Sequence, residues 1–313
     1  MSGPLAQADG PGVGTSVGLA LVLFLAMATA GMSASPLGEE RLFFIGRAAG
    51  HDRQVYCVRP DGGDLRALTQ SARDKRRPAL AAAGGTRLAY STSRGELWLL
   101  DVQTLRETRI AAPERQDMWD QPAWSPEGQQ LLAVRIDLVP QEQSDLYQLL
   151  PEPLTRPWFG MSGMEQQPAF SQDGSKVAFA YFEKRRQGIV EESLWVLDVR
   201  ARQAVKVLAD GSDNHHPVWL DPHELVYVSN VSGSANLWKL DVRSGVASAL
   251  TTGPEIAEEP SVSPDGTRLA YMTVREGRPK LVIRELAGGA PHVLQLALEE
   301  SREPVWGRWR TVK

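Results

Sequence analysis

The sequence predicts an all-β protein, a six-bladed β-propeller whose blades are four-stranded antiparallel sheets. Three observations predict this fold. A short strand that begins with proline recurs every 43 to 49 residues, at Pro78, Pro122, Pro168, Pro217, Pro260 and Pro304. The first five copies are followed by further strand patterns, and the sixth is only half a copy. A repeat of this length built from short strands is typical of blade arrays.

The first half of the repeat is clearest in residues 122–134, PAWSPEGQQLLAV. An apolar strand ends in the residues Ser-Pro-Glu-Gly at 125–128, and a second apolar strand follows. Serine, proline and glycine at the first, second and fourth positions favour a type I turn. Strands joined this tightly are antiparallel neighbours. The same unit begins at Pro168 and Pro260, with degenerate copies at Pro78 and Pro217.

The second half of the repeat begins with a leucine and an aromatic residue. The tryptophans of this position are Trp98, Trp195 and Trp238, and the acid three residues later is Asp101, Asp198 or Asp241. We expect these aspartates to stabilise turns within each blade. The tryptophans, with Trp124 and Trp219 of the first strand, are expected to pack between blades. Trp158 falls outside the repeat, so its removal is expected to cost less than that of Trp195.

The half copy at Pro304 predicts how the ring closes. It supplies a first strand, and the N-terminal part supplies the others, beginning with Leu42–Phe44. Pairing of strands from the two chain ends removes the open edge of a linear array. We therefore assign residues 35–313 to the propeller, with 41–70 and 302–310 forming the shared closing blade.

Residues 1–34 are expected to form a signal peptide or a membrane anchor. Their apolar core is Gly18–Ala30, and Ala28-Thr29-Ala30 has the spacing of a signal-peptidase site. The segment is also about long enough, at ~20 residues, to span a bilayer uncleaved and so contact the membrane. In either case the propeller is expected in the periplasm, free or anchored and facing it.

Composition and motifs narrow the function. The 34 basic and 38 acidic residues give a net charge of −4, which offers no electrostatic footprint for nucleic acid. One cysteine, Cys57, excludes an intrachain disulfide and a cysteine-based metal cluster. No nucleophile elbow, zinc-protease motif or phosphate loop is present. We expect a monomeric, non-enzymatic protein without a cofactor or metal.

The residues WSPEG, FSQDG and VSPDG, each followed by an apolar strand, resemble the WD40-like Pro-Asp repeat of TolB-family β-propellers. The resemblance covers about residues 41–310. It implies a periplasmic propeller that binds an envelope protein partner, as in the Tol–Pal system. TolB itself has an α/β domain before its propeller, and the interval from Met32 to Arg41 leaves no room for one. The repeat also resembles propellers attached to peptidases and those of pectate-degrading lyases.

The candidate binding site is the mouth of the central channel. The six dipeptides before the opening prolines are all polar, and they are expected where the innermost strands begin. The candidate residues are Arg77, Asp120, Gln167, His215, His216, Glu258, Glu259, Arg302 and Glu303. Because neighbouring residues of a strand point to opposite faces, only one of each pair is expected to reach the channel.

Two function classes remain open. The first is a non-enzymatic protein-binding propeller of the cell envelope, with a basic side chain or a chain terminus of the partner drawn to Glu258, Glu259 and Glu303. Glu259→Lys is then expected to weaken capture and, because the mouth is solvated, to leave the fold intact. The alternative is a small-ligand or sugar-acid lyase propeller, with a ligand or metal at the same mouth. The long links Asp137–Ser144 and Glu183–Glu192 are expected at this end.

Overall fold

The structure is a computed structural model that describes residues 38–82, 86–114, 116–139, 143–184 and 190–309. The described residues belong to one compact unit, and every regular element in them is a β-strand. None of them forms a helix that is long and apolar enough to cross a membrane. The predicted signal or anchor segment, residues 1–34, lies outside the described residues.

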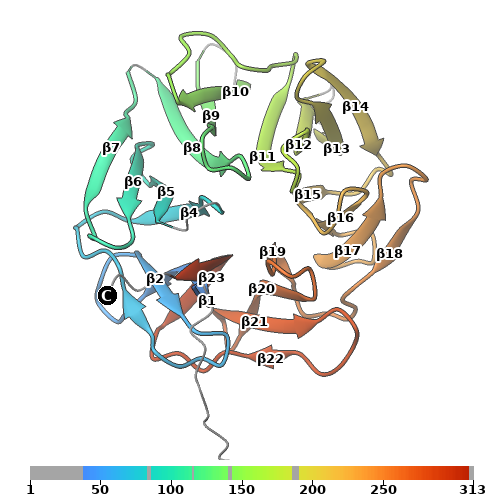
Figure 1. Cartoon of the computed structure of the whole chain (residues 1–313). Coiled ribbons are helices and arrows are strands. Elements are labelled where there is room, and N and C mark those ends of the chain that lie inside the picture. The colour runs from blue at the N-terminus through green and yellow to red at the C-terminus, as the bar shows by residue number, and fades with distance from the viewer. Residues whose placement is uncertain (1–37, 83–85, 115, 140–142, 185–189, 310–313) are drawn as a thin grey trace, which may run out of the picture. The chain divides into compact units, whose positions relative to one another are not determined.

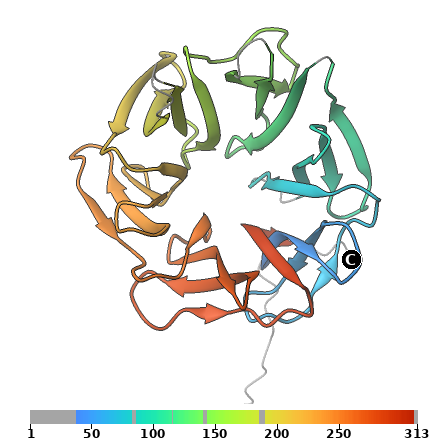
Figure 2. The same cartoon turned by 180° about the vertical axis from the view of Figure 1, so that it is seen from behind.

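The strands form antiparallel sheets arranged around a common centre (Figures 1 and 2). Three of the sheets have four strands that follow one another in sequence from the centre outward. The first contains β4 (Lys75–Leu80), β5 (Arg87–Thr92), β6 (Leu97–Asp101) and β7 (Glu107–Ala111). The second contains β15 (Asn214–Trp219), β16 (Glu224–Ser229), β17 (Asn236–Asp241) and β18 (Ala247–Ala249). The third contains β19 (Glu258–Val262), β20 (Arg268–Arg275), β21 (Arg278–Glu285) and β22 (His292–Val293).

A fourth four-stranded sheet joins the two ends of the described chain. Its strands are β23 (Glu300–Trp309), β1 (Glu39–Arg47), β2 (Gln54–Val58) and β3 (Arg66–Ala67). Strand β23 is antiparallel to β1, with Leu42 opposite Trp306 and Phe43 opposite Val305. The predicted pairing of the first and last strands is therefore present, and β23 takes the innermost position of this sheet.

The remaining strands form one seven-stranded sheet. They are β8 (Asp117–Trp124), β9 (Leu131–Asp137), β10 (Gln143–Leu150), β11 (Met164–Phe170), β12 (Lys176–Lys184), β13 (Val190–Asp198) and β14 (Gln203–Leu208). The sheet consists of an antiparallel group β8–β10 and an antiparallel group β11–β14, joined by one parallel contact between Ser144 and Met164. The β8–β10 group lacks the fourth strand that the repeat predicts. In its place Phe159 makes a single bridge to Leu146.

The turns follow the predicted chemistry. In the turn between β11 and β12, the Asp173 carboxylate accepts hydrogen bonds from the hydroxyl and backbone N–H of Ser175, and Gly174 has a φ of +71°. Asp101 and Asp241 each accept two backbone N–H groups of the turn after the third strand. These aspartates are structural, as the sequence indicated.

The tryptophans divide into two groups. Trp124, Trp219 and Trp306 of the innermost strands are buried against the preceding sheet. A basic side chain at the start of that sheet's second strand lies over each indole, namely Arg87, Lys176 and Arg268. Trp98, Trp195 and Trp238 are only partly buried. The second set thus packs against the apolar clusters between blades, as expected, but it is not fully buried there.

Trp158 lies outside the repeat, as predicted, but it is more deeply buried than Trp195. Its side chain is 4% exposed and packs in the cluster formed by β9, β10, β12 and β13. Its backbone N–H donates to the Leu146 carbonyl at 2.7 Å, and the Arg202 guanidinium stacks on its ring at 4.2 Å. The irregular segment that replaces a fourth strand thus uses Trp158 to cover the sheet, which the repeat register could not reveal.

We expect Trp158→Ala to cost about 3–5 kcal/mol of unfolding free energy, because it opens a cavity under a buried indole. Trp195→Ala should cost markedly less, since its indole is partly exposed and contacts Tyr181 and Ser193 at the surface of the same cluster. Denaturant unfolding of the two variants measures both costs. An equal or larger cost for Trp195→Ala would contradict the packing described here.

Candidate functional site

Each innermost strand is interrupted by a bulge at the residues before its proline. The pairing register shifts between Arg76 and Ala79 in β4, and at the equivalent position of β8, β11, β15, β19 and β23. The second residue of each dipeptide has a left-handed φ of 49° to 55°: Arg77, Gln121, Gln167, His216, Glu259 and Glu303. Such a backbone is uncommon outside glycine and persists only where its surroundings impose it.

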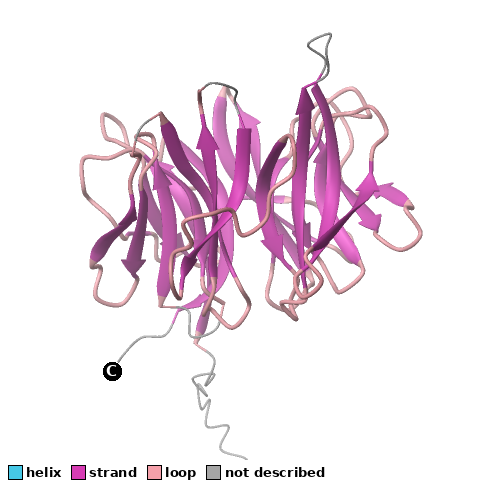
Figure 3. Ribbon diagram, turned by 90° about the horizontal axis from the view of Figure 1, so that it is seen from above, coloured by secondary structure: helices cyan, strands magenta, loops and turns pink. Residues whose placement is uncertain are grey.

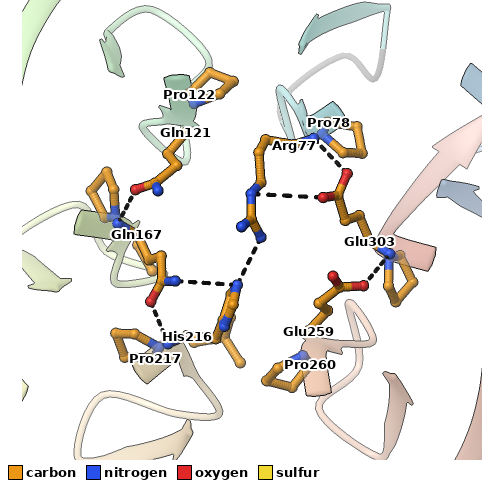
Figure 4. A pocket seen from close by; sticks show the side chains of 14 residues that line it. Arg77, Pro78, Gln121, Pro122, Gln167, His216, Pro217, Glu259, Pro260 and Glu303 are labelled. Atoms are coloured by element: carbon orange, nitrogen blue, oxygen red, sulfur yellow. Dashed lines mark hydrogen bonds and ion pairs between the residues drawn. The ribbon is translucent and has the colours of Figure 1, made fainter. Parts of the chain in front are cut away.

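The dipeptides therefore lie within the first five residues of the innermost strands, close to the predicted place where these strands begin. The bulge turns the second residue of each pair toward the centre. These six residues and the prolines that follow them line a cavity of about 160 Å³ (Figure 4). We call the six residues the channel ring. Their position directly before a proline is the sequence signal that identifies them.

The structure separates the predicted candidates. Five of them belong to the channel ring: Arg77, Gln167, His216, Glu259 and Glu303. A sixth ring member, Gln121, was missed, because Asp120 of the same dipeptide was chosen in its place. The other candidates, Asp120, His215, Glu258 and Arg302, do not line the cavity. Only one member of each pair lines it, as alternation indicated.

The first members of the pairs make lateral contacts. Asp120 is 5% exposed and accepts hydrogen bonds from Arg76, at 2.7 Å, and from the Ser91 hydroxyl. Arg302 forms an ion pair with Glu259. Burial raises the pKa of Glu258 and lowers that of His215. Asp120 and Arg302 therefore each join two neighbouring innermost strands of the wall.

The channel ring is held together by a repeated hydrogen bond. A side-chain oxygen of one ring residue accepts the backbone N–H of the next. Glu259 accepts from Glu303 at 2.7 Å, and Glu303 accepts from Arg77 at 2.6 Å. We call these three residues the acidic arc. In the same way Gln121 accepts from Gln167 at 2.5 Å, and Gln167 accepts from His216 at 2.7 Å. We call these three the amide arc.

Each arc ends at a basic residue, and the two ends meet. The Arg77 Nη1 lies 2.8 Å from the His216 Nε2, and Figure 4 shows the two side chains pointing toward one another. An arginine side chain has no acceptor, which ends the acidic arc. The backbone N–H of Gln121 donates instead to the Asp120 carboxylate at 2.9 Å.

The contacts of His216 define its protonation. Arg77 and the Gln167 amide Nε2, at 3.3 Å, both place N–H donors at Nε2, so Nε2 accepts. The proton then lies on Nδ1, which donates to Nδ1 of His215 at 2.7 Å. Burial, with Arg77, His215 and Arg302 nearby, lowers the pKa of His216 well below its usual range. His216 is therefore a neutral acceptor at neutral pH.

The ring is also less solvated than expected. Glu259 and Glu303 are 5% and 8% exposed, and burial raises the pKa of Glu303 to about 7, against the opposing effect of Arg77. Glu259→Lys would remove an acceptor from the Glu303 N–H and the counter-ion of Arg302. The mouth is thus not solvated at this residue, and we now expect this change to destabilise the fold. Among the described residues, no three His, Cys, Asp or Glu side chains are grouped to hold a metal.

Comparison with known proteins agrees with this fold. Residues 157–307 match the family model of the TolB beta propeller domain. A TolB homolog of Chlorobium luteolum is 30% identical over 139 residues, which are 44% of this chain and 30% of that protein. The chain therefore matches less than a third of the length of this curated relative.

Solved structures show the same fold. TolB from Acinetobacter baumannii has a TM-score of 0.70 at 22% identity, over 85% of this chain and 66% of that one. An oligogalacturonate lyase in complex with manganese has a TM-score of 0.50 at 13% identity, over 82% and 74% of the two chains. The predicted resemblance to TolB-family β-propellers is therefore confirmed, by the family model over residues 157–307 and by the likeness in fold.

The channel ring can be tested at Gln167, which both donates and accepts. Gln167→Leu should lower the unfolding free energy by about 1–3 kcal/mol, because the His216 N–H loses its acceptor inside the wall. Gln167→Glu keeps an oxygen at this position and should cost less. Thermal or denaturant unfolding of both variants distinguishes the effect of losing the side-chain oxygen from the effect of changing the side chain's volume. Equal costs for the two would show that this hydrogen bond does not matter.

Proposed function

We propose that the protein is a non-enzymatic, protein-binding propeller of the bacterial cell envelope, with six blades. The blade count follows if the groups β8–β10 and β11–β14 of the seven-stranded sheet are taken as two blades, because each has its own innermost strand and ring residue. Periplasmic location, free or anchored through residues 1–34, is part of this proposal. It is supported by the likeness to TolB homologues.

The observation that best supports a protein partner is a set of exposed aliphatic side chains. Leu138 and Val139 follow β9, Val231 lies between β16 and β17, and Val274 lies near the end of β20. All four are 37% to 57% exposed. Leu138, Val139 and Val231 lie in links between a second and a third strand, and Val274 is the next-to-last residue of β20, directly before such a link. Such links share one end of the propeller because the blades are equivalent. Loops occupy both ends of the strands (Figure 3).

Aliphatic side chains exposed on loops of a rigid scaffold are typical of contact surfaces. We call Leu138, Val139, Val231 and Val274 the apolar rim. Val246 is exposed as well, but it follows the turn between β17 and β18, at the opposite end and on the periphery. The sugar-acid lyase alternative has only a fold likeness in its favour.

The rim can be tested with variants of the full chain. Leu138→Ser with Val139→Ser, and separately Val231→Ser, should reduce capture of an envelope protein by at least about tenfold, because apolar contact area is lost. Capture from an envelope extract identifies the partner, and calorimetry with the purified partner then measures affinity. Val246→Ser removes a valine that is even more exposed, at the other end, and is the matched control. Equal effects of the rim and control variants would refute this surface.

A further inference from the structure

The hydrogen bonds of the channel ring determine what the cavity can bind. The ring contains two carboxylates, two amides, one guanidinium and one imidazole. Its carboxylates suggested a site for a basic group. The direction of each hydrogen bond shows which of these groups remain available to a ligand.

The acceptors of the ring are already engaged with the protein. One oxygen of Glu259, one of Glu303 and the amide oxygens of Gln121 and Gln167 each accept a backbone N–H of the next ring residue. The second oxygen of Glu259 accepts from Arg302. The second oxygen of Glu303 lies 3.6 Å from the Arg77 Nε. The acceptor His216 Nε2 faces Arg77 and Gln167.

The side-chain hydrogen-bond donors of the ring have fewer partners within the protein. Among the described residues, no hydrogen bond engages the Arg77 Nη2 or the Gln121 Nε2, and both residues line the cavity. The Gln167 Nε2 makes only the 3.3 Å contact to His216. A ligand that enters the cavity therefore meets amide and guanidinium N–H groups, which favour an acceptor.

The charges near the cavity also favour a ligand that accepts hydrogen bonds. Arg76 is paired with Asp120 at 2.7 Å, and Arg302 is paired with Glu259. Arg77 has the weaker partner, because its Nε is 3.6 Å from Glu303. Burial raises the pKa of Glu303 to about 7, so this carboxyl is partly protonated at neutral pH. Arg77 is thus the cation that is least neutralised around the cavity.

We propose that the channel ring binds a carboxylate group, with Arg77 as its cation and the amides of Gln121 and Gln167 as further donors. A guanidinium beside amide donors matches the planar acceptor geometry of a carboxylate. The volume of about 160 Å³ accepts one carboxylate and a few carbon atoms. The site therefore fits the end of a molecule, such as a polypeptide terminus or an acidic side chain. This inference rests on the proposed function in one respect, because it takes the carboxylate to come from a protein partner.

The test uses small probes and the full chain labelled with ¹⁵N-histidine. N-acetylglycine offers a carboxylate, N-acetylglycinamide is its neutral counterpart, and glycinamide offers an ammonium group. The first should shift the His216 ring signals saturably, because the ligand competes for the N–H groups that face Nε2. The neutral amide should bind at least about tenfold more weakly. Equal binding of the amide, or tighter binding of glycinamide, would overturn the proposal.

Three variants test whether the shift of the His216 ring signals depends on the channel ring. Arg77→Gln introduces glutamine, the residue that positions 121 and 167 carry at a similar backbone angle. This variant should bind N-acetylglycine at least about tenfold more weakly. Glu303→Gln retains an acceptor for the Arg77 N–H and removes a negative charge, so it should tighten binding several-fold. Arg94→Gln is the control, because Arg94 is exposed on the link between β5 and β6 and does not line the cavity. Unchanged affinity in Arg77→Gln, or weaker binding in Glu303→Gln, would refute the assignment.

The same experiments separate this site from the proposed function. Carboxylate binding without any rim-dependent protein partner would leave the site in place and refute the binding-platform proposal. A partner captured through the rim by a protein that fails to bind N-acetylglycine would do the reverse. If a purified partner neither competes with N-acetylglycine nor loses affinity for the Arg77→Gln variant, the natural ligand is a free small carboxylate. This result would refute a protein partner as the source of the carboxylate.

Discussion

The geometry of the channel depends on one interaction, a side-chain oxygen that accepts the backbone N–H of the next innermost strand. A bulge frees this N–H from its own sheet, and a buried N–H needs a partner. Four ring residues receive one in this way, from Gln121, Gln167, Glu259 and Glu303. The bond joins neighbouring sheets, which also contact each other through apolar clusters and through lateral ion pairs such as Arg76–Asp120 and Arg302–Glu259. The ring residues that it connects have a left-handed backbone conformation.

This interaction explains the composition of the ring. A residue that accepts a neighbouring N–H must have a side-chain oxygen, which accounts for glutamate and glutamine at four positions. Arg77 and His216 end the two arcs, so they are free to face the cavity and each other. The carboxylates stabilise the wall, while the donors remain directed at the space inside it. On this proposal, the number of acidic residues around the channel does not indicate the charge of its ligand.

Much of the fold was predictable because the repeat is local. The turns at residues 125–128 and 171–174 combine serine, an acidic residue and glycine within four positions, and the terminal half copy at Pro304 required the pairing with β1. The exception was the segment around Trp158. Its burial depends on Leu146 and Arg202, contacts that no repeat spacing encodes.

The candidate site was predictable in part. Polar dipeptides before six prolines indicated the right region, and strand alternation indicated one residue from each pair. The choice of Asp120 over Gln121 was wrong because the bulge decides which side chain faces the centre. The sequence also could not show that the carboxylates of Glu259 and Glu303 accept hydrogen bonds from the wall, since the residues that donate to them are 44 residues or more away in sequence.

Hydrogen exchange at the ring amides tests the central claim most directly. In Glu303→Ala the Arg77 amide loses its acceptor, and its exchange should accelerate by at least about tenfold, the rate equivalent of ~1.4 kcal/mol. The Gln167 and His216 amides, which belong to the other arc, should keep their protection, and Glu303→Gln should retain protection at Arg77. Unchanged exchange at Arg77 in Glu303→Ala, or equal acceleration in both arcs, would contradict the account.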